Sequence, residues 1–371
     1  MMKNILDKYA ELLVKYCLEL KAGDRLYVRT TTAAEPLLIP LYQQVLEAGA
    51  VMDVQFRFRE QYRLLMNHGN EFQVTHINPL YETAVQDYDA FLSIMAPFNL
   101  REDQNANTES AKIRGKSMKA LTELYFQRTG SRDLRRSLCL FPTQASAQKA
   151  GMSLAEYEQF VYQACKLYDD NPIESWKALG RQQQKIVDFL NQREEFHYLG
   201  DNIDIRFSTK GRTWINSDGK NNMPSGEVYT SPVENGVNGH IHFSFPGYHM
   251  GNEVEGVTLY VKDGWIERWE ATRGKAFLDK IFAMEGTRRF GEAAIGTNYG
   301  IDRLTGNILF DEKIGGTVHM AIGQSYHQAG GKNSSSVHWD MITDMTKEGA
   351  IFADGEKIYE KGRFLPEIMN T

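Results

Sequence analysis

The N-terminal half of the chain alternates strand patterns with helical patterns. Apolar residues recur at helical spacing between Ile5 and Leu20, and residues 24–30 then follow a strand pattern. The same order repeats with a predicted helix over 35–48 and predicted strands over 51–56, 88–94 and 137–141. Strands that are separated by helices pair in parallel, and helices cover both faces of such sheets. The pattern therefore predicts a parallel-sheet α/β domain.

The C-terminal half has a different pattern. A helical pattern over 153–193 is followed by short alternating strands that begin at 204–208 and are interrupted by Gly, Asn and Asp. A length of 371 residues also favours two domains over one. We therefore expect an α/β domain with a helical connector over residues 1–195, and a mixed α+β, strand-rich domain over residues 196–371.

Composition and charge exclude several classes of function. A net charge of -6 argues against a nucleic-acid partner, which requires a basic face. No stretch reaches the roughly 18 consecutive apolar residues of a membrane helix, and the N-terminus lacks the apolar stretch of a signal peptide. No Gly-x-Gly-x-x-Gly run follows a predicted strand, which argues against a dinucleotide site. We expect a cytoplasmic protein whose three cysteines, Cys17, Cys139 and Cys165, are reduced and buried.

Five side chains in the last third of the chain can bind a metal ion. They are carboxylates and imidazoles without a cysteine, which is typical of a catalytic site rather than of a structural zinc site. The five residues are Glu227, Glu292, His319, His338 and Asp340. The set predicts a metal-dependent hydrolase.

Each candidate taken alone also has an ordinary explanation. Glu292 follows Arg288 and Arg289 and can simply form an ion pair, and a lone histidine in an apolar strand is often a hydrogen-bonded core residue. His338 and Asp340 give the strongest local signal, because residues i and i+2 of a strand face the same way. His240 and His242 form a weaker pair of the same kind, since no carboxylate accompanies them in the sequence.

Four motifs surround the five candidate ligands. They are Pro-Ser-Gly-Glu227, Gly-Glu292-Ala-Ala-Ile-Gly, His319-Met-Ala-Ile-Gly-Gln-Ser-Tyr326 and Val-His338-Trp-Asp340. In order and spacing these motifs, together with the segment 141–158, resemble the aminopeptidase T and aminopeptidase S family of metallopeptidases. The resemblance extends over essentially the whole chain.

The resemblance implies a cytoplasmic, dimeric exopeptidase that releases amino acids from the N-terminus of peptides with the help of two divalent cations. It implies that the five candidates are ligands and that Tyr326 is a catalytic phenol. The chain departs from the family pattern at Glu312, which lies farther before His319 than the acidic residue of the family does. Glu312 is therefore predicted as an additional ligand or a general base. Zinc, cobalt, manganese and magnesium all suit such ligands.

The predicted chemistry follows from these groups. Two cations can activate a water molecule, and Tyr326 can donate a hydrogen bond to the oxyanion that develops. Glu292 or Glu312 can carry the proton to the leaving amine. Two alternatives use the same ligand types. One is a two-metal phosphohydrolase with a cationic clamp drawn from Arg288, Arg289 and Lys332, and the other is a noncatalytic protein with a closed structural ion site.

Overall fold

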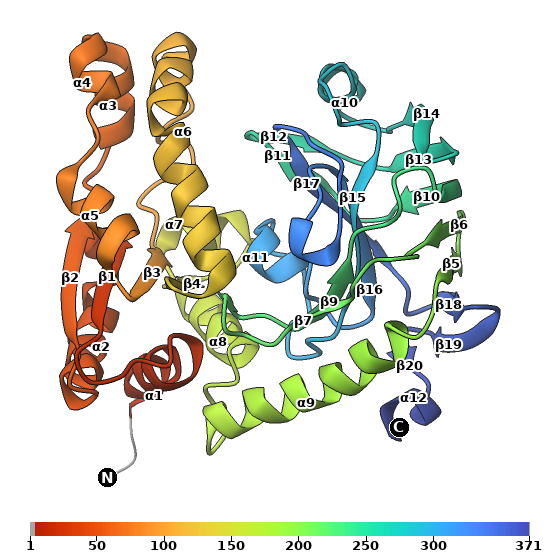
Figure 1. The fold of residues 1–371 in the computed structure, drawn as a ribbon, viewed down its shortest axis with the longest axis horizontal. Coiled ribbons are helices and arrows are strands. Elements are labelled where there is room, and N and C mark those ends of the chain that lie inside the picture. Colours follow the sequence, from red (N-terminus) through yellow and green to blue (C-terminus); the bar gives the residue numbers. More distant parts are fainter. Residues whose placement is uncertain (1–3, 371) are drawn as a thin grey trace. The chain divides into compact units, whose positions relative to one another are not determined.

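The computed structural model describes residues 4–370. The chain forms two compact units (Figure 1). The first unit comprises Met1–Ser175 and Gly219–Pro224, and the second comprises Trp176–Asp218 and Ser225–Thr371. The sequence predicts a domain boundary between residues 195 and 196. That boundary stays a prediction about which segments fold on their own.

The first unit contains a five-stranded sheet in which every pair of neighbouring strands is parallel. Its strand order is β2-β1-β3-β4-β8. The strands are β1 (Arg25–Thr30), β2 (Val51–Phe56), β3 (Ala90–Met95), β4 (Arg135–Leu140) and β8 (Asn222–Met223). The parallel α/β sheet predicted from the sequence is thus confirmed.

Helices connect these strands. Many of them begin at a side chain that accepts a hydrogen bond from a free backbone N–H of the first turn, such as Asn4, Asn107 and Ser153. The helical segments are α1 (Ile5–Glu11), η1 (Leu12–Cys17), η2 (Thr32–Ala34), α2 (Glu35–Glu47), α3 (Gln61–His68), α4 (Glu71–Thr75), α5 (Pro79–Asp87), α6 (Thr108–Ser131), α7 (Gln144–Lys149) and α8 (Leu154–Ala164). Cys17, Cys139 and Cys165 are free and buried, as predicted.

The second unit is built from antiparallel sheets and begins within α9 (Pro172–Leu190). Its larger sheet has eight strands in the order β14-β13-β10-β6-β5-β18-β19-β20. These strands are β5 (Glu195–Gly200), β6 (Ile203–Ser208), β10 (Val237–Phe243), β13 (Val257–Lys262), β14 (Trp265–Glu270), β18 (Ala350–Ala353), β19 (Glu356–Glu360) and β20 (Arg363–Phe364).

A second antiparallel sheet in this unit has five strands in the order β17-β16-β15-β9-β7. The strands are β7 (Ile215–Ser217), β9 (Glu227–Thr230), β15 (Phe290–Gly296), β16 (Thr317–Gly323) and β17 (His338–Asp344). The remaining elements are the hairpin β11 (Gly247–His249) and β12 (Asn252–Val254), and the helices α10 (Lys275–Phe282), α11 (Ile308–Asp311), η3 (His327–Ala329) and α12 (Pro366–Asn370). The predicted strand-rich C-terminal part is confirmed.

One apolar core in the second unit contains side chains from both large sheets. Phe207 and Ile241 come from the eight-stranded sheet, Val318 and Met320 come from the five-stranded sheet, and Leu278 comes from α10. Burial of such apolar surface is the main favourable contribution to folding. It fixes which face of each strand points to the core, and so leaves the opposite face of the five-stranded sheet for polar groups. Within residues 4–370 no helix has the length and apolar character needed to cross a membrane.

Candidate metal centre

The pairing register places the predicted ligands on one face of the five-stranded sheet. Directly opposite residues of an antiparallel pair have their side chains on the same face. On at least one neighbouring strand, each candidate ligand of the sheet faces a glycine or an alanine. Gly296 faces Glu227, Ala294 faces His319, Ala321 faces Asp340 and Gly323 faces His338. These small residues leave room for the large polar side chains between them.

Glu292 reaches the same face through a β-bulge. In β15 the register shifts between Phe290 and Glu292, because Phe290 pairs with Ile322 while Glu292 pairs with the next residue, Ala321. Gly291 is therefore the extra residue, and it changes the face on which Glu292 emerges. Phe290 lies in the apolar core, and without the bulge Glu292 would point to that core as well.

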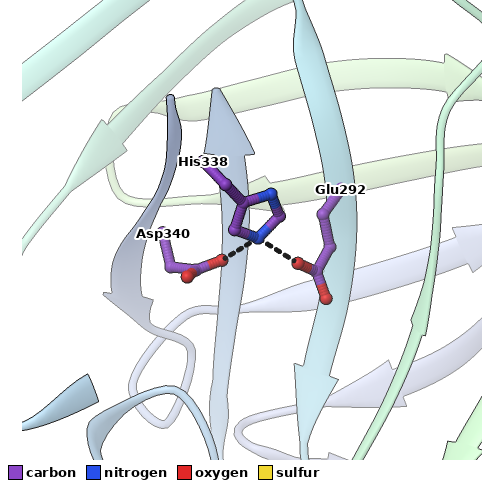
Figure 2. A group of neighbouring side chains, drawn as sticks. All are labelled: Glu292, His338 and Asp340. Carbon is purple, nitrogen blue, oxygen red and sulfur yellow. Dashed lines mark hydrogen bonds and ion pairs between the residues drawn. The ribbon is translucent and has the colours of Figure 1, made fainter. Parts of the chain in front are cut away.

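Glu292, His338 and Asp340 form the first group of ligand atoms (Figure 2). His338 Nε2 lies 3.1 Å from Glu292 Oε2 and 3.4 Å from Asp340 Oδ1. The other ring nitrogen, His338 Nδ1, donates to the backbone oxygen of Gln324 at 2.7 Å. A hydrogen bond of this kind fixes the ring and leaves Nε2 for a metal ion.

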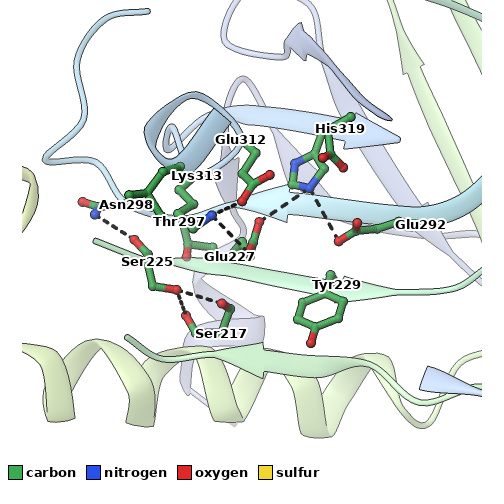
Figure 3. Close-up of polar contacts among 12 residues, drawn as sticks. Ser217, Ser225, Glu227, Tyr229, Glu292, Thr297, Asn298, Glu312, Lys313 and His319 are labelled. Atoms are coloured by element: carbon green, nitrogen blue, oxygen red, sulfur yellow. Dashed lines mark hydrogen bonds and ion pairs between the residues drawn. The ribbon is translucent and has the colours of Figure 1, made fainter. Parts of the chain in front are cut away.

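Glu312, His319 and Asp340 form a second group, so Asp340 belongs to both. The ligand atoms of each group lie within 4.8 Å of one another. His319 Nε2 is also 3.5 Å from Glu227 Oε2 and 3.7 Å from Glu292 Oε1, and these contacts draw the two groups together (Figure 3). The structure thus brings all six predicted ligands to one place, including Glu312 despite its unusual distance from His319 in the sequence.

Lys313 is a part of this cluster that sequence reasoning missed. Its side chain is completely buried, its Nζ lies 3.5 Å from Glu227 Oε1, and it forms a second ion pair with Glu312 (Figure 3). In the sequence Lys313 ends the charged run Asp311-Glu312-Lys313, which reads as an ordinary solvated segment. Buried lysine is rare unless it is paired, so only the folded structure shows its place in the cluster.

Several buried polar atoms of the cluster lack a hydrogen-bond partner among the described residues. They are Glu227 Oε2, Asp340 Oδ1 and both ring nitrogens of His319. A buried polar atom without a partner is costly, and bound cations would satisfy the carboxylate oxygens together with one ring nitrogen of His319. Oxygen and imidazole donors also suit zinc, cobalt, manganese and magnesium. The residues therefore fit a metal centre.

The charges of the cluster shift its pKa values. Burial opposes protonation of His319, but the carboxylates of Glu292 and Glu227 outweigh it and raise the pKa of His319 to about 9. Burial raises the pKa of Glu312 to about 8, against the opposing effect of Lys313. The neighbouring His338 outweighs burial and holds the pKa of Asp340 well below its usual range. A metal ion would take the place of the imidazole proton and pair with the same carboxylates.

Tyr326 stands at the edge of the cluster, just before η3. Its ring centre lies 5.1 Å from that of His338 and 5.1 Å from that of Tyr229. Its backbone N–H donates to Ser231 Oγ at 3.2 Å, which holds the start of the turn. The Glu292 carboxylate, with burial adding to it, raises the pKa of Tyr326. The phenol therefore keeps its proton and remains a hydrogen-bond donor.

Glu227 is held by its backbone as well as by its side chain. Gln183 of α9 donates from Nε2 to the backbone oxygens of Glu227 at 2.9 Å and Ser217 at 3.1 Å. The preceding residue, Gly226, has a φ of +112°, and a Cβ there would lie 2.7 Å from Asn298 Cβ. Only glycine fits such a position. The turn that the sequence predicts before Glu227 therefore fixes a buried carboxylate and not a surface one.

The remaining candidates lie apart from this cluster. His242 Nδ1 is 2.9 Å from Thr258 Oγ1, and the His240 ring stacks on Tyr260 at 5.9 Å. Among the described residues these two histidines join no group of three potential ligands. The guanidinium groups of Arg288 and Arg289 lie over the Trp265 ring, and backbone oxygens accept hydrogen bonds from them. They are thus engaged away from the role of a phosphate clamp.

Carboxylates and imidazoles that meet on one face of a sheet are the ligand types of a metal-dependent hydrolase. The chain belongs to the thermophilic metalloprotease (M29) family, whose family model matches residues 2–364. The family and the hydrolase class predicted from the motifs are confirmed.

Known relatives agree with this assignment. Aminopeptidase 2 of Geobacillus stearothermophilus is 27% identical in an alignment of length 413, which covers 98% of this chain and 98% of that protein. Aminopeptidase PepS of Streptococcus thermophilus is 28% identical over 252 residues, covering 59% of this chain and 60% of that protein. The solved structure of wild-type AmpT from Thermus thermophilus, 22% identical, has a TM-score of 0.84 and covers 97% of this chain and 99% of that chain, which shows a shared fold.

The bulge generates a prediction about Gly291. A Cβ at this residue would lie 2.2 Å from the backbone oxygen of Gln324, which cannot move aside as a flexible side chain can. We expect Gly291→Ala to lower the free energy of unfolding by about 1–3 kcal/mol, the usual cost of overpacking. Urea unfolding followed by tryptophan fluorescence measures this, because all five tryptophans lie at residue 176 or beyond.

Gly200→Ala is the matched control. Gly200 ends β5 in the same unit, and a Cβ there would meet Ile203 Cδ1 at an ordinary distance of 3.4 Å. This variant should stay within about 0.5 kcal/mol of the wild type, as is usual where no special feature is lost. Equal stability of the two variants would show that the bulge does not require glycine.

Proposed function

We propose that this protein is a metal-dependent aminopeptidase that releases N-terminal amino acids from peptides and uses two divalent cations. The observation that carries the proposal is the pair of ligand groups that share Asp340 on one sheet face, with their ligand atoms within 4.8 Å of one another in each group. Membership of a metalloprotease family and the names of the relatives, which are aminopeptidases, support the same activity.

The two groups suggest two cation positions. We assign Glu292, His338 and Asp340 to a first position, and Glu312, His319 and Asp340 to a second position. Glu227 belongs to the second position because its Oε2 lies 3.5 Å from His319 Nε2. Zinc, cobalt, manganese and magnesium are the candidate ions.

Two bound divalent cations would make a water molecule more acidic and would polarise the peptide carbonyl. Tyr326 donates a hydrogen bond from its phenol to the oxygen on which negative charge develops. Glu292 or Glu312 carries the proton that the leaving amine takes up. One of the cations would also hold the free amine of the substrate through its lone pair, which would account for selection of a free N-terminus.

The setting in which the enzyme acts is part of the proposal. From the family resemblance and the sequence composition we propose a cytoplasmic homodimer. Its partners are peptides with a free N-terminus. Nucleic acid does not suit a protein with a net charge of -6.

The first test is the substrate itself. Protein treated with a chelator should not hydrolyse leucine anilide, and added zinc, cobalt, manganese or magnesium should restore hydrolysis because the ligand groups refill. N-acetyl-leucine anilide should remain intact with every metal, since its amine is blocked. Initial rates on the two anilides and on a phosphomonoester, measured side by side, provide the comparison. Cleavage of the acetylated substrate would remove the exopeptidase claim, and activity on the phosphomonoester alone would favour a phosphohydrolase.

Ligand variants test the two positions separately. We expect Asp340→Ala to lose both cations, because Asp340 belongs to both groups, whereas His338→Ala and His319→Ala should each lose one. Peptidase activity should fall at least about a hundredfold in all three, more than is usual for residues that only support a ligand. Elemental analysis after dialysis gives the metal content. Full activity with two bound cations in Asp340→Ala would contradict the ligand assignment.

Tyr326→Phe tests the proposed hydrogen-bond donor. The variant should keep both cations, while kcat falls about 10²- to 10³-fold, as expected when one oxyanion donor is removed. Tyr260→Phe, on the eight-stranded sheet, is the matched control and should keep wild-type turnover. Loss of metal from Tyr326→Phe would instead show that the phenol supports the structure of the site.

A further inference from the structure

Lys313 is a buried positive charge that the proposed chemistry does not use. Its side chain is completely buried and is paired with two carboxylates, Glu227 and Glu312. The two residues that it contacts both belong to the second cation position as assigned above, and neither belongs to the first group. Lys313 therefore affects the two positions unequally.

The backbone holds Lys313 in place. Its N–H donates to the backbone oxygen of Phe310 at 3.0 Å, and its own backbone oxygen accepts from the N–H of Asn298 at 3.0 Å. Ile314, the next residue, forms an isolated bridge with Asn298. Because the backbone is fixed on both sides, the ammonium group is a permanent part of the cluster and is not carried on a mobile loop.

A fixed ammonium group beside a cation position has two effects. It repels a second positive charge, and this repulsion is strong where water is excluded. It also pairs with the carboxylates of Glu227, through Oε1, and Glu312, and so offsets part of the negative charge that would attract a cation to the second position. Both effects weaken binding at the second position, while the first position, which has no direct contact with Lys313, keeps its affinity.

We propose that Lys313 is a built-in positive charge that makes the second cation position, formed by Glu227, Glu312, His319 and Asp340, the weaker and more exchangeable of the two. The proposal rests on the two-cation function proposed above. It assigns Lys313 the role of a positioning residue, which keeps Glu227 and Glu312 paired and acts on substrate only through the cation that they bind.

A purely structural role for Lys313 makes a different prediction. If the ammonium group served only to neutralise two buried carboxylates, its removal would loosen the cluster and weaken cation binding generally. In contrast, removal of a repelling charge leaves the negative charge of two carboxylates without an ammonium partner, which should tighten cation binding at the second position alone. The sign of the change in metal affinity therefore separates the two roles.

The experiment is a titration of the chelator-treated full-length protein with Co²⁺, followed by visible absorption and by calorimetry. The wild type should bind two ions with unequal dissociation constants. We expect Lys313→Met to lower the larger dissociation constant, that of the second position, about tenfold or more, which is about 1.4 kcal/mol. The smaller dissociation constant should stay unchanged. Lys313→Arg should behave like the wild type because it keeps the charge.

Lys357→Met is the matched control, since it removes a lysine of β19 whose Nζ pairs with Glu360 at 2.8 Å on the surface. It should leave both constants unchanged. If the wild type binds two ions and Lys313→Met leaves the larger dissociation constant unaltered or raises it, the proposed role of Lys313 is wrong. Binding of a single Co²⁺ by the wild type would instead count against the proposed two-cation function.

A second measurement keeps the inference testable if Lys313→Met does not fold. His338→Ala retains only the second position and His319→Ala retains only the first. With Lys313 in place in both, His338→Ala should bind Co²⁺ about tenfold more weakly than His319→Ala. Equal affinities, or the reverse order, would overturn the inference.

Discussion

The pairing register of the five-stranded sheet is the constraint on which the candidate metal centre depends. A strand presents alternate residues to opposite faces, so a shift of one residue would exchange the polar face for the core face. Here the core face is fixed by apolar residues such as Val318 and Met320, which leaves His319 on the other side. On at least one neighbouring strand a glycine or an alanine lies opposite each candidate ligand of the sheet. These small residues provide the space in which the six candidate ligands meet.

The burial of so many charged groups is possible because they compensate one another. Carboxylates, imidazoles and one ammonium group form ion pairs with one another, most of them at distances of 3.1–3.7 Å. A buried ion cluster is costly to desolvate and adds little to stability by itself. Its presence in the middle of a sheet is therefore better explained by cation binding than by folding.

Much of the fold and of the site could be predicted from the sequence. The strands β1, β2 and β3 follow clear patterns, and the motifs around His319 and His338 point to the candidate ligands, which the structure brings together. Other features leave no local signal. The bulge at Gly291 depends on where the partner strand pairs, β8 is only two residues long, and α6 buries little beyond Leu121. Lys313 was missed because a run of charged residues such as Asp311-Glu312-Lys313 is usually solvated, and its burial is a property of the folded chain.

The segment that carries β8 has a consequence for how the chain can be divided. The chain passes between the two units three times, at residues 175–176, 218–219 and 224–225. The short strand β8 pairs with β4 through Leu138 and Asn222, and through Cys139 and Met223. A protease that cuts only the first crossing would therefore leave the N-terminal fragment hydrogen-bonded to a strand that belongs covalently to the other fragment. Nicked protein of this kind would migrate as two bands under denaturing conditions and as one species under native conditions.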